Sequence, residues 1–385
     1  MLLTGGGTGG HLFPGLALAE RLRGECGVHV AFAGAERGIE ARLLPELGEE
    51  LTTFAVLPFR GAGAGGALRA ARALRSGISE ARALLRGRGR PAVVVGLGGY
   101  SAAPLLCAAA LEGIPSVLLE QNAVLGAGNR LLSLKADALF AGLPLGLPLR
   151  LRRRSRILGS PLRGYFSDAF ARAAGNKTPI GGASQAAPSA SERSHGTGAR
   201  RMRVLVLGGS QGAGSLNRYA PEVLRHFDVE VRHQVGRGEV DAVTRAYAAA
   251  GVQAEVFSFL GEPGALYGEV DVALCRGGAL TLAELSALGI PALVVPYPYA
   301  ASDHQRANAE HYTRDGAVLI LPDSDLATPN AARTFAELLG AGSGSTPNAH
   351  TLAKRAHQMR MLARPHAASI IANILHKTYV LAEQA

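Results

Sequence analysis

The chain has 385 residues, of which 48% are hydrophobic and 18% charged, a length sufficient for two domains that each bury a core. This composition excludes a disordered protein, and three cysteines are too few for a small disulfide scaffold. The net charge of +10 favours an anionic partner. Charge alone does not distinguish among a phosphorylated ligand, a membrane surface and a nucleic acid.

The sequence predicts a cytoplasmic protein. Its N-terminus carries neither the basic nor the apolar region of a signal peptide. The longest apolar stretches are too short or too interrupted to span a bilayer. The cysteines at 26, 107 and 275 are widely spaced and fit a reducing compartment.

Short β-rich runs alternate with helical patterns, which is typical of a parallel sheet with crossover helices. A short strand is predicted at residues 1–4, and further strands are predicted at 28–33, 92–95, 116–119, 204–207, 270–274 and 292–295. A glycine-rich turn and a helix follow the first strand, and the same arrangement follows the strand 204–207. The sequence therefore predicts an α/β protein with two doubly wound Rossmann-like domains that face each other across a cleft.

The domain boundaries follow from composition. Residues 174–201 are rich in Gly, Ser, Ala, Thr and Pro, so we expect a disordered low-complexity insertion there. The first domain is predicted at 1–163, completed by a C-terminal helix at about 365–385. The second domain is predicted at 202–364.

The first candidate site is the glycine-rich turn at residues 5–10. It places backbone amides at a helix start, where an anion such as pyrophosphate binds, unless the turn serves the fold alone. The turn also fits GxGxxG, and Glu36 after the second strand could hold a dinucleotide ribose, which leaves a Rossmann NAD(P) oxidoreductase open. His11 at this turn is a candidate general base.

Polar side chains follow two predicted buried strands of the first half. Tyr100 comes after the strand 92–95, and Glu120 and Asn122 come after the strand 116–119, with Asn129 close behind. Such positions lie on the ligand-binding rim of a parallel sheet, so they suit a hydroxyl-rich ligand, although loop and cap chemistry explains the asparagines equally well.

Three clusters follow strands of the second half. Ser210, in a second glycine loop, can donate to a phosphate oxygen. Arg276 precedes a glycine turn and a helix start with Glu284 one turn inside, which suits a diphosphate beside a ribose diol. Gln305 and Asn308 share one helix face and can bind sugar hydroxyls.

Together these motifs resemble the MurG family, the peptidoglycan N-acetylglucosaminyltransferases of the GT-B fold. The motifs are GGGTGGHLFPGLALAERL at the start, GLGGYSAAP at 96–104, LEQN at 119–122, GGSQGAGSLN at 208–217, CRGGALTLAE at 275–284 and DHQRANA at 303–309. The resemblance implies inverting transfer of N-acetylglucosamine from UDP-N-acetylglucosamine to the C4 hydroxyl of the muramoyl sugar of lipid I (undecaprenyl-pyrophosphoryl-MurNAc-pentapeptide), which gives lipid II.

The resemblance also implies residue roles. Donor binding is implied for Arg163, Ser210, Leu260, Arg276, Ala279, Leu280, Thr281, Glu284, Gln305 and Asn308. Acceptor and phosphate binding is implied for Thr8, Gly9, Gly10, His11, Tyr100, Asn122 and Asn129, with His11 as candidate base and Glu120 beside the reacting hydroxyl. Because a sugar nucleotide already carries a good leaving group, we expect neither a cofactor nor an obligatory metal.

The implied partners are UDP-N-acetylglucosamine, lipid I, an anionic membrane surface and other cell-wall and division proteins, but no nucleic acid. We expect a peripheral protein on the cytoplasmic face of the inner membrane. Apolar and basic residues alternate at helical spacing over residues 68–86, a pattern that suits either a lipid surface or a core-facing helix with a solvated basic face. Gly77 interrupts it.

Three departures and two rivals qualify the resemblance. The family usually has His, Asn and Ser where this chain has Leu119, Ser160 and Gly277, which puts local acceptor and hinge contacts in question. A UDP-N-acetylglucosamine 2-epimerase shares the fold and the donor, although the GGTGGH motif at the start and the GGSQGA loop at 208–213 argue against it. A nucleic-acid-binding protein is the non-enzyme alternative that the net charge allows.

Overall fold

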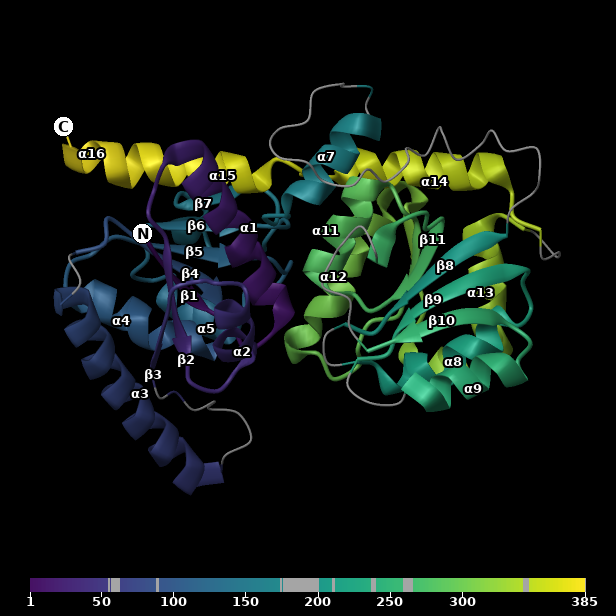
Figure 1. The fold of residues 1–385 in the computed structure, drawn as a ribbon, viewed down its shortest axis with the longest axis horizontal. Helices are drawn as coiled ribbons and strands as arrows, with labels where there is room; N and C mark the ends of the chain where they lie inside the picture. The colour runs from purple at the N-terminus through teal and green to yellow at the C-terminus, as the bar shows by residue number, and fades with distance from the viewer. Residues whose placement is uncertain are drawn as a thin grey trace. The chain divides into compact units, whose positions relative to one another are not determined.

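A computed structural model gives the fold (Figure 1) and describes residues 1–54, 56, 63–87, 90–173, 175, 201–209, 212–236, 240–258, 266–341 and 346–384. The chain divides into two compact units, Met1–Arg163 with His366–Ala385, and Gly164–Pro365. Each unit contains one parallel sheet with helices, which confirms the predicted α/β fold class. The predicted insertion at 174–201 lies outside the described residues except at its two positions 175 and 201.

The sheet of the first unit has seven parallel strands in the order β3-β2-β1-β4-β5-β6-β7. They are β1 (Leu2–Gly5), β2 (Ala31–Ala35), β3 (Leu51–Phe54), β4 (Val94–Gly98), β5 (Ser116–Glu120), β6 (Ala138–Ala141) and β7 (Ser155–Ile157). The short β1 lies at the centre, paired with β2 and β4. The turn after β1 therefore lies where the strand order reverses, the place at which doubly wound sheets bind ligands.

Helices cover this sheet and complete its core. They are α1 (Gly9–Cys26), α2 (Ile39–Glu46), α3 (Gly63–Gly87), α4 (Ala103–Leu111), α5 (Ala127–Leu132), α6 (Leu149–Arg152), α15 (Ala367–Leu375) and α16 (Leu381–Gln384). The C-terminal α15 packs against α1 (Figure 1). Ile371 and Leu375 of α15 are fully buried in the same apolar cluster as Leu12 and Leu18 of α1. The end of the chain is thus part of the first core.

The basic amphipathic pattern forms the helix α3, which runs through Gly77 without interruption. Ala81 and Leu85 are buried in the core, and Arg82 and Arg86 form ion pairs with Glu112 at the end of α4. The second half of α3 therefore packs against the core, which agrees with the predicted alternative of a core-facing helix. Within the described part of the chain, no helix is both long and apolar enough to cross a membrane.

The sheet of the second unit has six parallel strands in the order β10-β9-β8-β11-β12-β13. They are β8 (Met202–Leu207), β9 (Val229–Gln234), β10 (Gln253–Phe257), β11 (Val272–Cys275), β12 (Ala292–Val294) and β13 (Val318–Ile320). Here β8 and β11 lie at the centre, so the turns after these two strands occupy the ligand-binding position of the second sheet.

Helices lie on both faces of this sheet (Figure 1). On one face are α8 (Gly214–Leu224), α9 (Val240–Ala249) and α13 (Pro329–Leu339), and on the other α11 (Ala279–Leu288) and α12 (His304–Thr313). Two further helices, α7 (Gly164–Ala173) and α14 (Ala349–Leu362), pack against α11. The helix that follows Arg276, α11, therefore packs against other helices of its own unit.

A buried polar network lies in the core of the second unit. The Nδ1 atom of His233 lies 3.0 Å from the Tyr247 hydroxyl, and its Nε2 atom lies 3.2 Å from Asn217 Oδ1. Since an amide oxygen only accepts, Nε2 carries the proton and Nδ1 accepts from Tyr247. Burial lowers the pKa of His233 to about 3, so the imidazole is neutral in the folded protein.

We expect acid to destabilise the second unit through His233. Between about pH 6.5 and 3 the unfolded chain binds a proton on this residue and the folded chain does not, so the free energy of unfolding falls as the pH is lowered. This one group contributes up to about 1.4 kcal/mol per pH unit. Urea unfolding from pH 7 to pH 4 measures the slope. His233→Gln, which cannot titrate, should flatten it, and an unchanged slope would contradict the assignment.

Candidate active site

The turn between β1 and α1 forms a helix N-terminus that can bind an anion. Gly5 has a φ of +134°, and a Cβ there would lie 2.5 Å from the carbonyl oxygen of Gly98, so the turn requires glycine. Thr8 is the N-cap of α1 but makes no side-chain cap, and the first turn contains no acidic residue. The amides of Gly9 and Gly10 therefore lie at the positive end of the helix dipole.

Glu40 lies beneath this turn and was missed in the sequence. It is fully buried, and its Oε2 atom accepts from the Gly7 amide at 2.8 Å. A Cβ on Gly6 or on Gly38 would lie 2.4 Å from its carboxyl group. Burial and the negative charge of Glu40 raise the pKa of Tyr100. The glycines around Glu40 are the signal that could have found it, because they make room for its carboxylate.

His11 has the tautomer that a base requires. Its Nδ1 atom lies 3.1 Å from the carbonyl oxygen of Gly6 and 3.2 Å from Thr8 Oγ1. Because the carbonyl can only accept, Nδ1 carries the proton of the neutral ring, and the lone pair lies on Nε2. The structure thus brings His11 and Thr8 together at the turn.

Glu120 organises the loop that follows β5. Its Oε1 atom accepts from the amide and the side chain of Asn122 at 3.1 and 3.0 Å. Its Oε2 atom accepts from the Gly126 amide at 3.0 Å and from Asn129 Nδ2 at 3.1 Å. Asn129 also donates to the carbonyl of Leu119, whose side chain is buried in the core. This geometry favours a positioning role for Glu120, and direct catalysis by it stays a prediction.

The start of α11 forms a second anion site. Gly278 is its N-cap and provides no side chain to cap the helix, and the first turn contains no acidic residue. The amides of Ala279, Leu280 and Thr281 therefore remain as helix-terminal donors of the kind that binds a diphosphate.

Arg276, between β11 and α11, is held within its own unit. It is 7% exposed, and its guanidinium donates to Asp323 Oδ1 at 2.6 Å and to Ser215 Oγ at 2.7 Å. It also donates to the carbonyl of Val295 at 3.0 Å, and it lies over the ring of Tyr297. Arg276 thus braces several segments of the second unit, and its contact with the donor stays a prediction.

Gln305 and Asn308 have different environments although they share a helix. Gln305 Oε1 accepts from the amides of Gly277 and Tyr297 at 3.2 and 2.9 Å, so its NH2 group is the part that can meet a sugar hydroxyl. Asn308 is fully buried and donates to the carbonyl of Gly277 at 2.9 Å. A Cβ on Gly277 would lie 2.2 Å from the Gln305 carbonyl, which explains the glycine where the resemblance leads one to expect Ser.

The remaining predicted residues are scattered or not described. The guanidinium of Arg163 lies over the ring of Phe13, in the first unit. Glu284 Oε2 accepts from the hydroxyl of Tyr267 at 2.6 Å. Ser210 and Leu260 lie outside the described residues.

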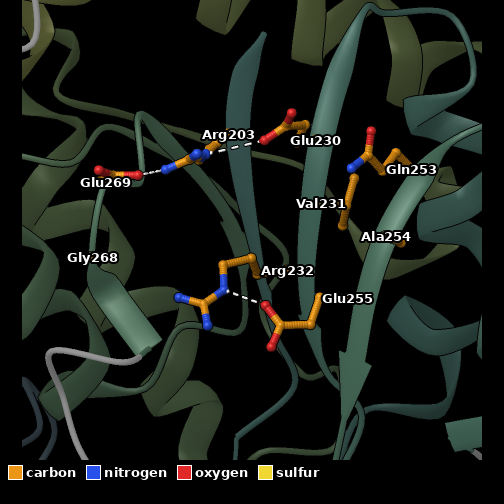
Figure 2. A pocket seen from close by; sticks show the side chains of 9 residues that line it. All are labelled: Arg203, Glu230, Val231, Arg232, Gln253, Ala254, Glu255, Gly268 and Glu269. Carbon is orange, nitrogen blue, oxygen red and sulfur yellow. Dashed lines mark hydrogen bonds and ion pairs between the residues drawn. The ribbon is translucent and has the colours of Figure 1, made fainter. Parts of the chain in front are cut away.

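A cavity of about 490 Å³ in the second unit contains none of the predicted site residues (Figure 2). Its charged side chains pair with one another: Arg203 with Glu230 at 3.1 Å and with Glu269, and Arg232 with Glu255 at 2.9 Å. Several of its residues lie near the starts of β8, β9 and β10, whereas parallel sheets bind ligands at the strand ends. We therefore do not assign the reaction to it.

Two doubly wound units, with helix N-termini after their central strands, are the architecture of the GT-B fold. Residues 1–141 match the glycosyltransferase family 28 N-terminal domain, and residues 203–359 match the C-terminal domain of that family. The chain belongs to glycosyltransferase family 28, which confirms the predicted enzyme class.

Relatives make the similarity more specific. The chain is 39% identical to the UDP-N-acetylglucosamine–N-acetylmuramyl-(pentapeptide) pyrophosphoryl-undecaprenol N-acetylglucosamine transferase of Alkalilimnicola ehrlichii, over 97% of each chain. It is 37% identical to the Pseudomonas aeruginosa protein of the same name, over 95% of each. These relatives confirm the predicted resemblance.

Solved structures agree with this assignment. The crystal structure of Acinetobacter baumannii MurG matches with a TM-score of 0.71 and 28% identity, over 98% of this chain and 99% of that chain. A Listeria monocytogenes structure described as a UDP-N-acetylglucosamine 2-epimerase matches with a TM-score of 0.62 but 11% identity, over 100% of this chain and 97% of that one. The second likeness shows the fold alone.

Proposed function

We propose that this chain transfers N-acetylglucosamine from UDP-N-acetylglucosamine to the C4 hydroxyl of the muramoyl sugar of lipid I, with inversion, to give lipid II. The observation that carries the proposal is the pair of uncapped helix N-termini, one beside an imidazole with its lone pair on Nε2 and one beside Glu284 and Gln305. The names of the relatives support the same donor and acceptor.

On the donor side, the reaction needs stabilisation of the charge that develops on the departing UDP. The helix-terminal amides of Ala279, Leu280 and Thr281 are fixed before the reaction and can supply it. Gln305 would bind the sugar through its NH2 group, and Glu284 would bind the ribose. Because the amides can stabilise the charge of the leaving group and an imidazole can take the proton of the acceptor hydroxyl, we propose a reaction without a resident cofactor or metal.

On the acceptor side, His11 would take the proton of the C4 hydroxyl on Nε2. The bond from Nδ1 to the Gly6 carbonyl holds the ring and favours the imidazolium that forms. The amides of Gly9 and Gly10 would bind the pyrophosphate of lipid I. Glu120 would hold Asn122 and Asn129 toward the acceptor.

We expect the protein to work at the cytoplasmic face of the inner membrane, because its proposed acceptor is linked to a lipid. Arg69, Arg72 and Arg75 of α3 are exposed, and Leu111 and Leu131, at the ends of α4 and α5, are 62% and 71% exposed. Exposed basic and apolar side chains on one unit support binding to an anionic surface. Contacts with other cell-wall and division proteins stay a prediction.

The test is release of UDP from UDP-N-acetylglucosamine, with and without lipid I in vesicles, followed by the mass of the product. We expect release to require lipid I and the product to gain one N-acetylhexosamine. Release without lipid I, accompanied by N-acetylmannosamine, would replace the proposal with an epimerase. Release of UDP should be faster with anionic vesicles than with neutral ones at low salt. Equal rates would contradict binding of the protein to an anionic membrane surface.

A further inference from the structure

The carboxylate of Glu284 is bound by a tyrosine from a distant part of the second unit. Glu284 lies in the second turn of α11, and Tyr267 precedes β11. The Tyr267 hydroxyl donates to Glu284 Oε2 at 2.6 Å, a distance typical of a hydrogen bond from a hydroxyl to an ionised carboxylate. The bond therefore fixes the direction in which this carboxylate points.

Tyr267 itself is fixed by aromatic packing. It is 4% exposed, and its ring meets that of Phe166 edge to face, with centroids 5.4 Å apart and planes at 78°. Phe166 is fully buried in α7 and meets Tyr165 in the same way at 5.4 Å and 84°. Since α7 also packs against α11, the ring of Tyr267 and the helix that bears Glu284 share one support.

This arrangement has a consequence for the recognition of a diol. A glutamate side chain on a helix surface samples several rotamers, and ordering them on binding weakens affinity. A carboxylate already oriented by a buried hydroxyl avoids that ordering, so its contact with two neighbouring hydroxyls becomes more selective.

We propose that Tyr267 is a positioning residue for the donor: through Glu284 it sets the preference of this unit for a uridine nucleotide with both ribose hydroxyls. The proposal rests on the ribose role of Glu284 in the proposed function. Tyr267 touches neither the sugar nor the phosphates in this scheme and acts only through the carboxylate.

The test compares UDP with 2′,3′-dideoxyuridine diphosphate in calorimetric titrations of the full chain. The wild type should bind UDP at least about tenfold more tightly, the effect of losing a hydrogen bond to a charged group. Tyr267→Phe should reduce this preference several-fold, because it lowers the affinity for UDP while the affinity for the dideoxy nucleotide stays the same. Tyr247→Phe, which removes another buried hydroxyl of this unit, should keep the preference.

The outcomes separate the two levels of the argument. A wild type without preference overturns the ribose role of Glu284 in the proposed function. If the wild type prefers UDP and Tyr267→Phe keeps this preference in full, only the role of Tyr267 is overturned. If Tyr267→Phe instead loses affinity equally for both nucleotides, Tyr267 only supports the fold, and its positioning role is also overturned. In the Glu284→Gln background, Tyr267→Phe should change the preference no further, and an additive effect would also overturn the proposal.

Discussion

Replacing His11 by Ala should lower the turnover number for lipid II synthesis by about 10² to 10⁴ fold, the usual contribution of a positioned general base. The imidazole lies on the first unit, whereas the predicted diphosphate and ribose contacts described in the structure lie on the second. The affinity for UDP-N-acetylglucosamine should therefore stay unchanged. Steady-state kinetics with both substrates varied, together with a UDP titration, measures the two effects separately.

Thr8→Ala is the matched control for this substitution. It removes the 3.2 Å contact with His11 Nδ1 but keeps the bond to the Gly6 carbonyl that sets the tautomer. We expect turnover to fall only by a few-fold. If His11→Ala turned over as fast as the wild type, another group would have to act as the base.

The strands predicted from the sequence are those buried at the centres of the sheets. The runs at 92–95 and 204–207 are continuously apolar because helices cover both faces of β4 and β8. Of the strands that were missed, β9 and β10 carry charged residues on one face, where Arg232 pairs with Glu255 across the strands. Their alternation of apolar and polar residues is typical of a half-buried strand, so these two strands could have been predicted from the sequence.

The candidate site was predictable where its chemistry is local. A glycine turn at a helix start is visible in adjacent residues, and so is the Arg276 cluster. The partners that orient these groups were not visible: Asp323 lies 47 residues after Arg276, and Glu40 lies 33 residues after Gly7. Such pairs are set by the order of strands in the sheet, which local spacing does not contain.

Replacing Asp323 by Ala should destabilise the second unit by about 3–5 kcal/mol, because it leaves the buried guanidinium of Arg276 without its carboxylate. Ser215→Ala removes a hydroxyl that accepts from the same guanidinium at 2.7 Å and donates to Asp323 at 2.7 Å, but it keeps the ion pair, so it should cost less, about 1.5–3 kcal/mol. The midpoint of urea unfolding measures both. A loss for Asp323→Ala no larger than that for Ser215→Ala would show that the carbonyls around Arg276 suffice to hold its charge.

The double variant Asp323→Ala with Arg276→Met then separates bracing from binding. Since apolar replacement of both members of a buried ion pair is often neutral or stabilising, the double variant should regain most of the stability that Asp323→Ala loses. If Arg276 only stabilises the turn before α11, any affinity for UDP that Asp323→Ala loses should return in the double variant together with the stability. If Arg276 also contacts the diphosphate, as the resemblance implies, stability returns and the affinity for UDP stays low, because the cation itself is gone.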